Sequence, residues 1–234
     1  MSTTYVGGEL EVFQHAVNWK RYVASFFKPY VQGSVAEIGA GLGANVPYLF
    51  NEAVHRYLCI EPDEGLATSI ENKIASGILS DNCFIQKGIL PLDTANAFDA
   101  LLYIDVLEHI EDDATEVIKA ATALRVGGYL CVLVPANPAH YSAFDKASGH
   151  LRRYTKTSLI NVVMPSLQIK QCHYLDCFGA LASKANRYFL RQSLPSQNQV
   201  LFWDRILVPA SRIVDKLTDY RFGKSLLLVA QKEQ

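Results

Sequence analysis

Two kinds of hydrophobic pattern alternate along this chain. Short, nearly continuous apolar runs predict buried strands, and apolar residues at helical spacing predict helices between them. The strands are predicted at residues 35–38, 57–60, 83–86, 98–103, 129–134, 168–174 and 225–230. This alternation predicts an α/β fold, with a Rossmann-like, mostly parallel sheet and helices on both of its faces.

The helical pattern is clearest in two stretches. Residues 9–28 are expected to form one helix before the first strand, within an N-terminal cap over about residues 9–32. A later helix is expected to begin at residues 111–113 and to end at Gly127 and Gly128. Its sheet-facing residues are expected to be Val117, Ile118, Ala121 and Leu124. No repeat or low-complexity linker interrupts the 234 residues, so a single domain is expected.

The stretch after the first predicted strand combines three glycines with a later acid. Gly39, Gly41 and Gly43 form a loop, and glycine lets the backbone turn sharply and approach a ligand closely. Glu61 ends the next apolar run about twenty residues later, where a carboxylate can accept hydrogen bonds from ribose hydroxyls. The spacing predicts a nucleoside-binding corner.

Two cofactors fit this loop. Residues 39–44 satisfy the dinucleotide pattern G-x-G-x-x-G/A if Ala44 takes the last place. With Glu37 as the leading acid, they also satisfy the looser E/D-x-G-x-G-x-G pattern of S-adenosylmethionine (SAM) enzymes. A carboxylate at Glu37 would repel an anionic pyrophosphate but attract the sulfonium and ammonium groups of SAM. Glu37 therefore favours SAM, with a structural acid that caps the glycine turn as the alternative.

Two later segments agree with the SAM interpretation. Residues 98–110 read FDALLYIDVLEHI and residues 123–135 read ALRVGGYLCVLVP. With the glycine loop, the sequence resembles the class I SAM-dependent methyltransferases, in particular the small-molecule branch related to the ubiquinone-biosynthesis enzymes. It departs from them at Arg125 and Val126, where relatives have a Lys-Pro-like pair. The resemblance implies an antiparallel final strand, SAM as cofactor, and methyl transfer to a small or lipid-linked acceptor, with oxygen as the expected methylated atom.

The strand ends and the resemblance together place the cofactor. Residues 87–89 are expected at its adenine edge, where Ile89 replaces the acid of many relatives, and residues 103–105 at its methionine end. His109 is the candidate catalytic base, because imidazole titrates near neutral pH, and a structural role near the cofactor is the alternative. The expected cofactor contacts are Glu37, Gly39, Ala40, Gly41, Gly43, Glu61, Pro62, Lys87, Gly88, Ile89, Tyr103, Ile104 and Asp105.

Acceptor choice is expected to lie in a lid over about residues 136–158. This segment contains a G-H-x-R-R-Y run similar to one in bacterial relatives placed with cell-envelope or glycoconjugate enzymes. Its adjacent arginines could clamp a carboxylate or phosphate, or one of them could pair with Asp145 and hold the lid. The candidate acceptor-binding residues are His140, Tyr141, His150, Arg152, Arg153 and Tyr154.

Composition limits the partners. The net charge of −1 gives no basic surface for nucleic acid, and the five scattered cysteines and six histidines lack metal-site spacings. No export signal or membrane helix is recognised, so a cytoplasmic protein is expected. The helical insertion expected over about residues 178–219 includes a stretch, residues 178–217, that alternates aromatic and basic residues. It could cap the core, rest on a membrane beside a lipid-linked acceptor, or form a homodimer face.

Two other functions use the same glycine loop. A nicotinamide-dependent oxidoreductase would need a catalytic Tyr-x-x-x-Lys pair or an equivalent, and none is expected in this chain. A SAM-binding protein without turnover could serve as a regulatory subunit. The intact segment from Asp105 to His109 argues mildly against the second alternative.

Overall fold

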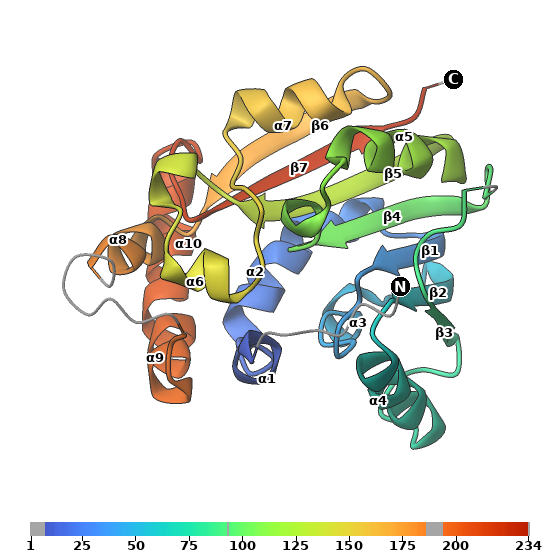
Figure 1. The fold of residues 1–234 in the computed structure, drawn as a ribbon, viewed down its shortest axis with the longest axis horizontal. Helices are drawn as coiled ribbons and strands as arrows, with labels where there is room; N and C mark the ends of the chain where they lie inside the picture. The colour runs from blue at the N-terminus through green and yellow to red at the C-terminus, as the bar shows by residue number, and fades with distance from the viewer. Residues whose placement is uncertain (1–7, 93, 186–193, 234) are drawn as a thin grey trace.

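The computed structural model describes residues 8–92, 94–185 and 194–233. These residues form one seven-stranded sheet in the order β3-β2-β1-β4-β5-β7-β6 (Figure 1). The strands β1 to β5 are parallel, and β7 is antiparallel to both of its neighbours, β5 and β6. The strand bounds are β1 (Gly33–Ile38), β2 (Val54–Glu61), β3 (Cys83–Lys87), β4 (Phe98–Ile104), β5 (Leu124–Pro135), β6 (Gln168–Leu175) and β7 (Ser225–Gln231). The predicted Rossmann-like sheet with an antiparallel final strand is confirmed.

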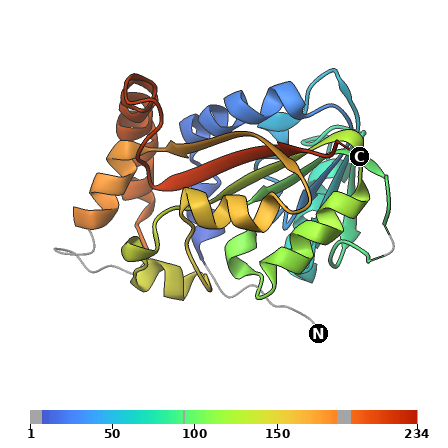
Figure 2. The same ribbon diagram turned by 90° about the horizontal axis from the view of Figure 1, so that it is seen from above.

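Helices cover both faces of the sheet. Figure 2 shows α2 on one face and α5 and α7 on the other. The helices are α1 (Glu9–Phe13), α2 (Val17–Phe27), α3 (Val46–Leu49), α4 (Glu64–Ala75), α5 (Asp113–Ala123), α6 (Ala143–Ala147), α7 (Lys156–Val163), α8 (Cys177–Ala185), α9 (Gln197–Phe202) and α10 (Val208–Leu217). Short helical turns are η1 (Lys28–Tyr30), η2 (Leu107–His109), η3 (Pro138–His140) and the π-helical turn η5 (Trp203–Leu207). In this part of the chain, no helix is both long and apolar enough to cross a bilayer.

The two faces of the sheet hold separate cores. Side chains alternate between the faces along each strand, so Val35 packs with the α2 side and Ala36 with the α5 side. Burial of both faces explains why the central strands are continuous apolar runs. Both cores are filled by side chains, and sheets of this kind bind ligands beyond the carboxyl ends of their strands.

The helix expected over residues 9–28 is interrupted. The backbone leaves the helical region at Ala16, so α1 ends at Phe13 and α2 begins at Val17. The carboxylate of Asp204 accepts hydrogen bonds from the backbone N–H groups of Asn18 and Trp19, at 3.1 and 2.8 Å. A carboxylate 186 positions further along the chain thus caps the start of α2, and the local sequence does not contain this signal.

Two expectations for α5 are also corrected. The helix ends at Ala123 and β5 begins at Leu124, before the glycines, because the Ala97 N–H already bonds to the Ala123 carbonyl and Phe98 pairs with Leu124. Ile118 is 55 % exposed, whereas Val117 is buried. The buried stripe follows residues 117, 120 and 121, as a period of 3.6 residues requires.

The helices α8 to α10 follow β6 and precede β7 in the sequence. Buried carboxylates attach them to the rest of the fold. Asp176 accepts hydrogen bonds from Gly179 N–H at 2.9 Å, Trp203 Nε1 at 2.8 Å and Ser211 Oγ at 2.8 Å. Asp215 accepts from the Asp176 N–H at 2.7 Å, from the Cys177 N–H and from the Tyr22 hydroxyl. Charged acceptors at a helix start strengthen such bonds, so this network joins the C-terminal helices to α2. Residues 186–193 of the expected aromatic and basic segment lie outside the described residues.

Candidate functional site

A cavity of about 350 Å³ lies at the carboxyl ends of β1, β2 and β4. One of its walls is the glycine loop with Glu61 and Pro62. The opposite wall is aromatic and includes Phe13, Trp19, Phe144 and Trp203. The cavity therefore has a polar, nucleoside-like half and an apolar half, both open to one space.

The glycine loop takes a conformation that side chains disfavour. The φ angles of Gly39, Gly41 and Gly43 are +62°, +57° and +67°. A Cβ atom on Gly39 would also lie 2.7 Å from the Val106 side chain. The loop can therefore press against the segment after β4 and leave its backbone exposed to a ligand, as the sequence predicts.

Glu61 ends β2 beside this loop and is buried. Its Oε2 accepts the Gly41 N–H at 2.7 Å, and its Oε1 accepts the Asp63 N–H at 2.9 Å. Burial raises the pKa of the carboxyl, and the two backbone hydrogen bonds oppose that shift. Each oxygen keeps a lone pair for a further donor, so Glu61 is oriented to accept the hydroxyls of a ribose.

Glu37 does not line the cavity. Its two oxygens accept hydrogen bonds from Asn45 Nδ2 and the Tyr57 hydroxyl, both at 2.8 Å. Burial raises the pKa of this carboxyl to about 7, and hydrogen bonds from Asn45 and Tyr57 oppose the rise. Asn45 does line the cavity. Glu37 thus supports the glycine turn through Asn45, which is the structural alternative considered above.

Five other expected cofactor contacts also lie outside the lining: Gly43, Lys87, Gly88, Ile89 and Tyr103. Lys87 pairs with Glu71 at 3.4 Å, Ile89 is 66 % exposed, and the Gly88 N–H bonds to the Glu61 carbonyl. The Tyr103 hydroxyl bonds to Glu116 of α5 at 2.8 Å, on the far face of the sheet from the cavity. Ala40, Pro62, Ile104 and Asp105 are in the lining together with the loop glycines Gly39 and Gly41. Gly43 borders the loop and packs toward Ile70 of α4.

His109 and His150 meet at the rim of the cavity. Their ring centroids are 4.9 Å apart, and both side chains line the cavity. Burial and the nearby His150 lower the pKa of His109 to about 4, so its imidazole is neutral at physiological pH. A neutral imidazole in the cavity can accept a proton, although the low pKa makes it a weak base.

The expected anion clamp is already occupied by carboxylates of the protein. Arg153 Nε and Nη2 donate to the two oxygens of Asp145 at 2.7 and 2.9 Å, and His150 Nδ1 lies 2.9 Å from Asp145 Oδ1. Although burial opposes it, these hydrogen bonds hold the pKa of Asp145 well below its usual range. Arg153 therefore holds the lid, which is the alternative considered for the arginines.

The other lid residues point away from the cavity. Arg152 pairs with Asp113 at 2.8 Å, and the Tyr154 hydroxyl bonds to the same carboxylate at 2.6 Å. The Tyr141 hydroxyl donates to the His150 carbonyl at 2.7 Å. These residues and His140 are absent from the cavity lining, so only His150 and Arg153 of the six candidates reach it.

Sequence reasoning missed Lys224 and the aromatic wall. Lys224 precedes β7, lines the cavity, and has its Nζ 4.8 Å from the Trp203 ring centroid and 5.5 Å from that of Phe13. The expectation that no Tyr-x-x-x-Lys pair occurs is wrong, because Tyr220 and Lys224 have this spacing. However, Tyr220 packs against Phe26 and His173 outside the cavity, so the pair does not converge on a ligand.

Comparison with known proteins agrees with this geometry. A family model described as a methyltransferase domain matches residues 36–132, which include the glycine loop, Glu61 and His109. No curated protein matches the sequence.

Similar solved structures cover nearly the whole chain at low identity. A complex between the Haloferax volcanii Trm112 methyltransferase activator and a methyltransferase matches with a TM-score of 0.68 and 13 % identity, over 96 % of this chain and 93 % of that chain. The [4+2]-cyclase SpnF matches with a TM-score of 0.64 and 14 % identity, over 99 % and 97 %. Burkholderia thailandensis 1,6-didemethyltoxoflavin-N1-methyltransferase, solved with bound 1,6-didemethyltoxoflavin and S-adenosylhomocysteine, matches with a TM-score of 0.62 and 14 % identity, over 97 % of this chain and 83 % of that chain.

The residues of the cavity fit SAM. A Cβ atom on Gly41 would lie 3.3 Å from the Leu10 side chain, so glycine at this position keeps the loop open to a ligand. Glu61 offers oriented acceptors for a ribose. The Tyr–Lys pair that the nicotinamide alternative requires does not converge on this cavity, because Tyr220 lies outside it. The matched domain and the fold together support a SAM-dependent methyltransferase of the class I, Rossmann-like type, with SAM as its cofactor.

Proposed function

We propose that the protein methylates an oxygen atom of a small acceptor that joins an apolar body to an anionic group. The observation that carries this proposal is Lys224, a cation placed in the apolar half of the cavity. Bound SAM supplies an electrophilic methyl group, so the protein's contribution is chiefly to position the acceptor for in-line attack.

The ammonium group of Lys224 has no carboxylate partner within 4.0 Å among the described residues. Burial and the positive charge of Arg153 lower its pKa, while Asp176, Asp105 and Asp145 favour the charged form. Its contacts are the faces of Trp203 and Phe13. A carboxylate, phosphate or phenolate on the acceptor would complete the site, since a buried cation without an anion is costly.

Oxygen is favoured because a hydroxyl must lose its proton when it is methylated, and His109 provides a neutral acceptor in the cavity. The aromatic wall formed by Phe13, Trp19, Phe144 and Trp203 would hold the flat or aliphatic body of the acceptor. Glu61 and the glycine loop would hold the nucleoside of the cofactor on the opposite side.

A direct test is methyl transfer from labelled SAM to a panel of hydroxy acids, phenols, amines and neutral alcohols of similar size. Lys224→Met should raise KM for the acidic acceptors about tenfold or more without changing SAM affinity, because it removes a charge-assisted contact. Lys170→Met, at an exposed position of β6, is the matched control. The proposal would be contradicted if Lys224→Met turned over the acidic acceptors as well as the wild type does. Mass spectrometry of the product identifies the methylated atom.

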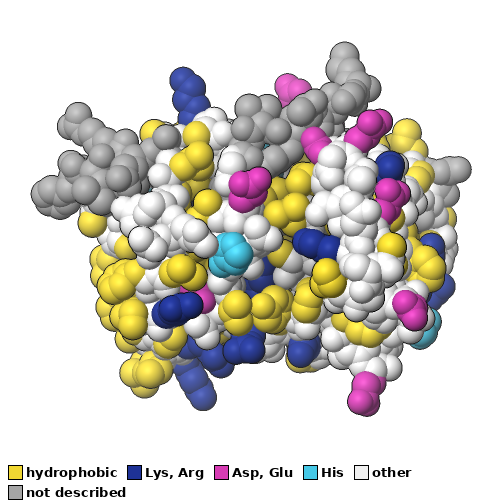
Figure 3. All heavy atoms as spheres, turned by 90° about the horizontal axis from the view of Figure 1, so that it is seen from below, with side chains coloured by type: hydrophobic (Ala, Val, Ile, Leu, Met, Phe, Trp, Pro, Cys, Tyr) yellow, Lys and Arg dark blue, Asp and Glu magenta, His cyan; other side chains and the backbone are white. Residues whose placement is uncertain are grey.

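A lipid-linked acceptor has separate support on the surface of α8 to α10. Phe202, Ile206, Ile213 and Leu217 are exposed at spacings of four and seven residues, beside the exposed Arg205, Arg212 and Lys216. Figure 3 shows the molecule from below, with hydrophobic side chains and nearby Lys and Arg on its left side, the side on which these helices lie in Figure 1. This composition suits the surface of an anionic membrane. Co-sedimentation with vesicles containing anionic lipid should occur and should weaken in Ile213→Asp, and absence of binding would remove the lipid-linked version.

A further inference from the structure

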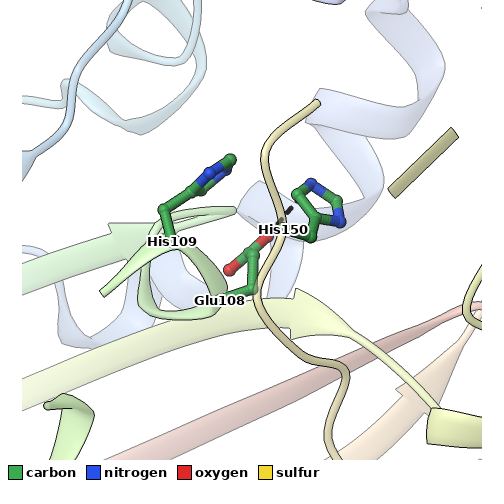
Figure 4. Close-up of side chains that lie close together, drawn as sticks. All are labelled: Glu108, His109 and His150. Carbon is green, nitrogen blue, oxygen red and sulfur yellow. Dashed lines mark ion pairs between the residues drawn. The ribbon is translucent and has the colours of Figure 1, made fainter. Parts of the chain in front are cut away.

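Three potential metal ligands converge at the rim of the cavity. Glu108 and His109 are neighbours in η2, directly after β4, and His150 comes from the lid (Figure 4). One ligand atom from each of the three side chains lies within 4.8 Å of the others. The Leu151 N–H bonds to the Glu108 carbonyl at 2.8 Å, which holds the lid against η2 and keeps His150 opposite the carboxylate.

Glu108 is fully buried and lacks partners. Its exposed fraction is 0 %, and neither carboxylate oxygen makes a hydrogen bond to another described residue. The nearest opposing group is His150 Nε2, 4.0 Å from Glu108 Oε1 and too far for a hydrogen bond. An unpaired buried carboxylate costs several kcal/mol, so the site lacks a positive group that would satisfy both oxygens.

Both histidines are already oriented by their other ring nitrogens or by backbone. His150 Nδ1 lies 2.9 Å from Asp145 Oδ1, which leaves Nε2 directed toward Glu108 (Figure 4). His109 hydrogen bonds to the backbone of Gly149. A carboxylate or carbonyl behind a metal-ligating imidazole is the usual arrangement, because it fixes the tautomer and the ring direction.

We propose that Glu108, His109 and His150 bind one divalent transition-metal ion, of the kind represented by Zn²⁺. Two imidazoles and a carboxylate form the ligand set of open, three-ligand zinc sites. Tetrahedral ligands at about 2.0 Å from a metal lie roughly 3.3 Å apart, so a contraction of up to about 1.5 Å within the cluster would complete the site. Because His109 and His150 line the cavity, the fourth position would face the acceptor.

A proton is the competing occupant of this space. A proton on Glu108 would neutralise the carboxyl group, but neither of its oxygens would gain a hydrogen-bond partner among the described residues. Arg153 already neutralises Asp145 through two hydrogen bonds, so the carboxylate that remains uncompensated is Glu108. A metal ion contacts that carboxylate and both imidazoles at once, which a single proton does not do.

The test is metal binding by the full chain after treatment with a chelator. Titration calorimetry with Zn²⁺ should give one equivalent with a micromolar or tighter Kd, and Co²⁺ should give the visible absorption bands of a low-symmetry site. Glu108→Gln and His150→Ala should each weaken Zn²⁺ binding about 100-fold or more, while His55→Ala, at an exposed histidine of β2, should bind as the wild type does. Zn²⁺ should also raise the Tm of the wild type but not that of Glu108→Gln.

Melting curves in chelator show whether each variant is folded, and Glu108→Gln should be at least as stable as the wild type there, because it removes the unpaired carboxylate. Absence of Zn²⁺ binding at 100 µM, or equal binding by the wild type and both variants, would overturn the proposal. These readouts do not involve turnover, so they do not depend on which acceptor is methylated. In the metal-bound form His109 is a ligand, so its role as a proton acceptor applies to the metal-free protein.

Discussion

The two halves of the cavity are built by different physical means. The cofactor half uses backbone: a loop of glycines with positive φ and Glu61, which is held by two backbone N–H groups. The acceptor half uses side chains from distant segments, joined by buried aspartates such as Asp176 and by the pair of Asp145 with Arg153. Backbone geometry of the first kind is set by nearby residues, whereas the second kind exists only after the whole chain has folded.

The comparison predicts that the largest stability effect lies in the acceptor half. Asp176→Asn keeps the shape of the side chain, and asparagine also tolerates the observed φ of +68°. Its amide NH₂ group, however, would face at least one of the three groups that now donate hydrogen bonds to Asp176. We expect a loss of about 2–4 kcal/mol of unfolding free energy. Denaturant unfolding followed by tryptophan fluorescence measures it, since Trp203 is one of only two tryptophans. Asp81→Asn, at an exposed position, is the control, and equal stabilities of the two variants would refute the role of the network.

The largest effect on cofactor binding is expected at Glu61. Glu61→Ala removes both acceptors for the ribose and releases two backbone donors, so SAM affinity should fall about 30- to 150-fold, or about 2–3 kcal/mol. Calorimetric titration with SAM measures this loss. Glu71→Ala, which removes a surface glutamate paired with Lys87, should change affinity less than twofold. A larger change in that control would indicate that Lys87, the partner of Glu71, contacts the adenine end of the cofactor.

A smaller, pH-dependent effect is expected at Glu37. The folded protein raises the pKa of this carboxyl from 4.5 to about 7, so the protonated form is the favoured one. Its contribution to stability is present below pH 4.5 and is lost as the pH rises through 7. Glu37→Gln should therefore gain about 1–2 kcal/mol relative to the wild type between pH 5 and pH 8. Unfolding curves across this range measure the gain, and a difference independent of pH would show that Glu37 does not titrate there.

The smallest effect is expected at Arg152. Its pair with Asp113 lies at the surface, where such pairs contribute less than about 1 kcal/mol. Arg152→Ala should leave Tm nearly unchanged and kcat/KM within about twofold for the acidic acceptors identified with Lys224. A tenfold loss of kcat/KM with normal SAM binding would show that the arginine reaches the acceptor.

Sequence patterns predicted most of the sheet, and they predicted the glycine loop and Glu61 at the carboxyl ends of its strands. All seven strands lie where the apolar runs predict them, because burial on both faces leaves a direct trace in the residue order. The division between α1 and α2 could not be predicted, since the carboxylate that caps α2 belongs to Asp204. The start of β5 at Leu124 was also missed, because it depends on pairing with Phe98 rather than on the glycines that follow.

The sequence by itself determined the α/β architecture, the glycine loop and the position of Glu61, because each depends on local backbone preference or on periodic burial. Only the tertiary structure decided which carboxylate holds Arg153, that Lys224 enters the cavity, and that Glu108 and His109 face His150 from 42 and 41 positions away in the chain. These contacts depend on how the lid and the C-terminal helices cross over the sheet. A crossing of that kind brings together residues whose separation in the sequence carries no periodic signal.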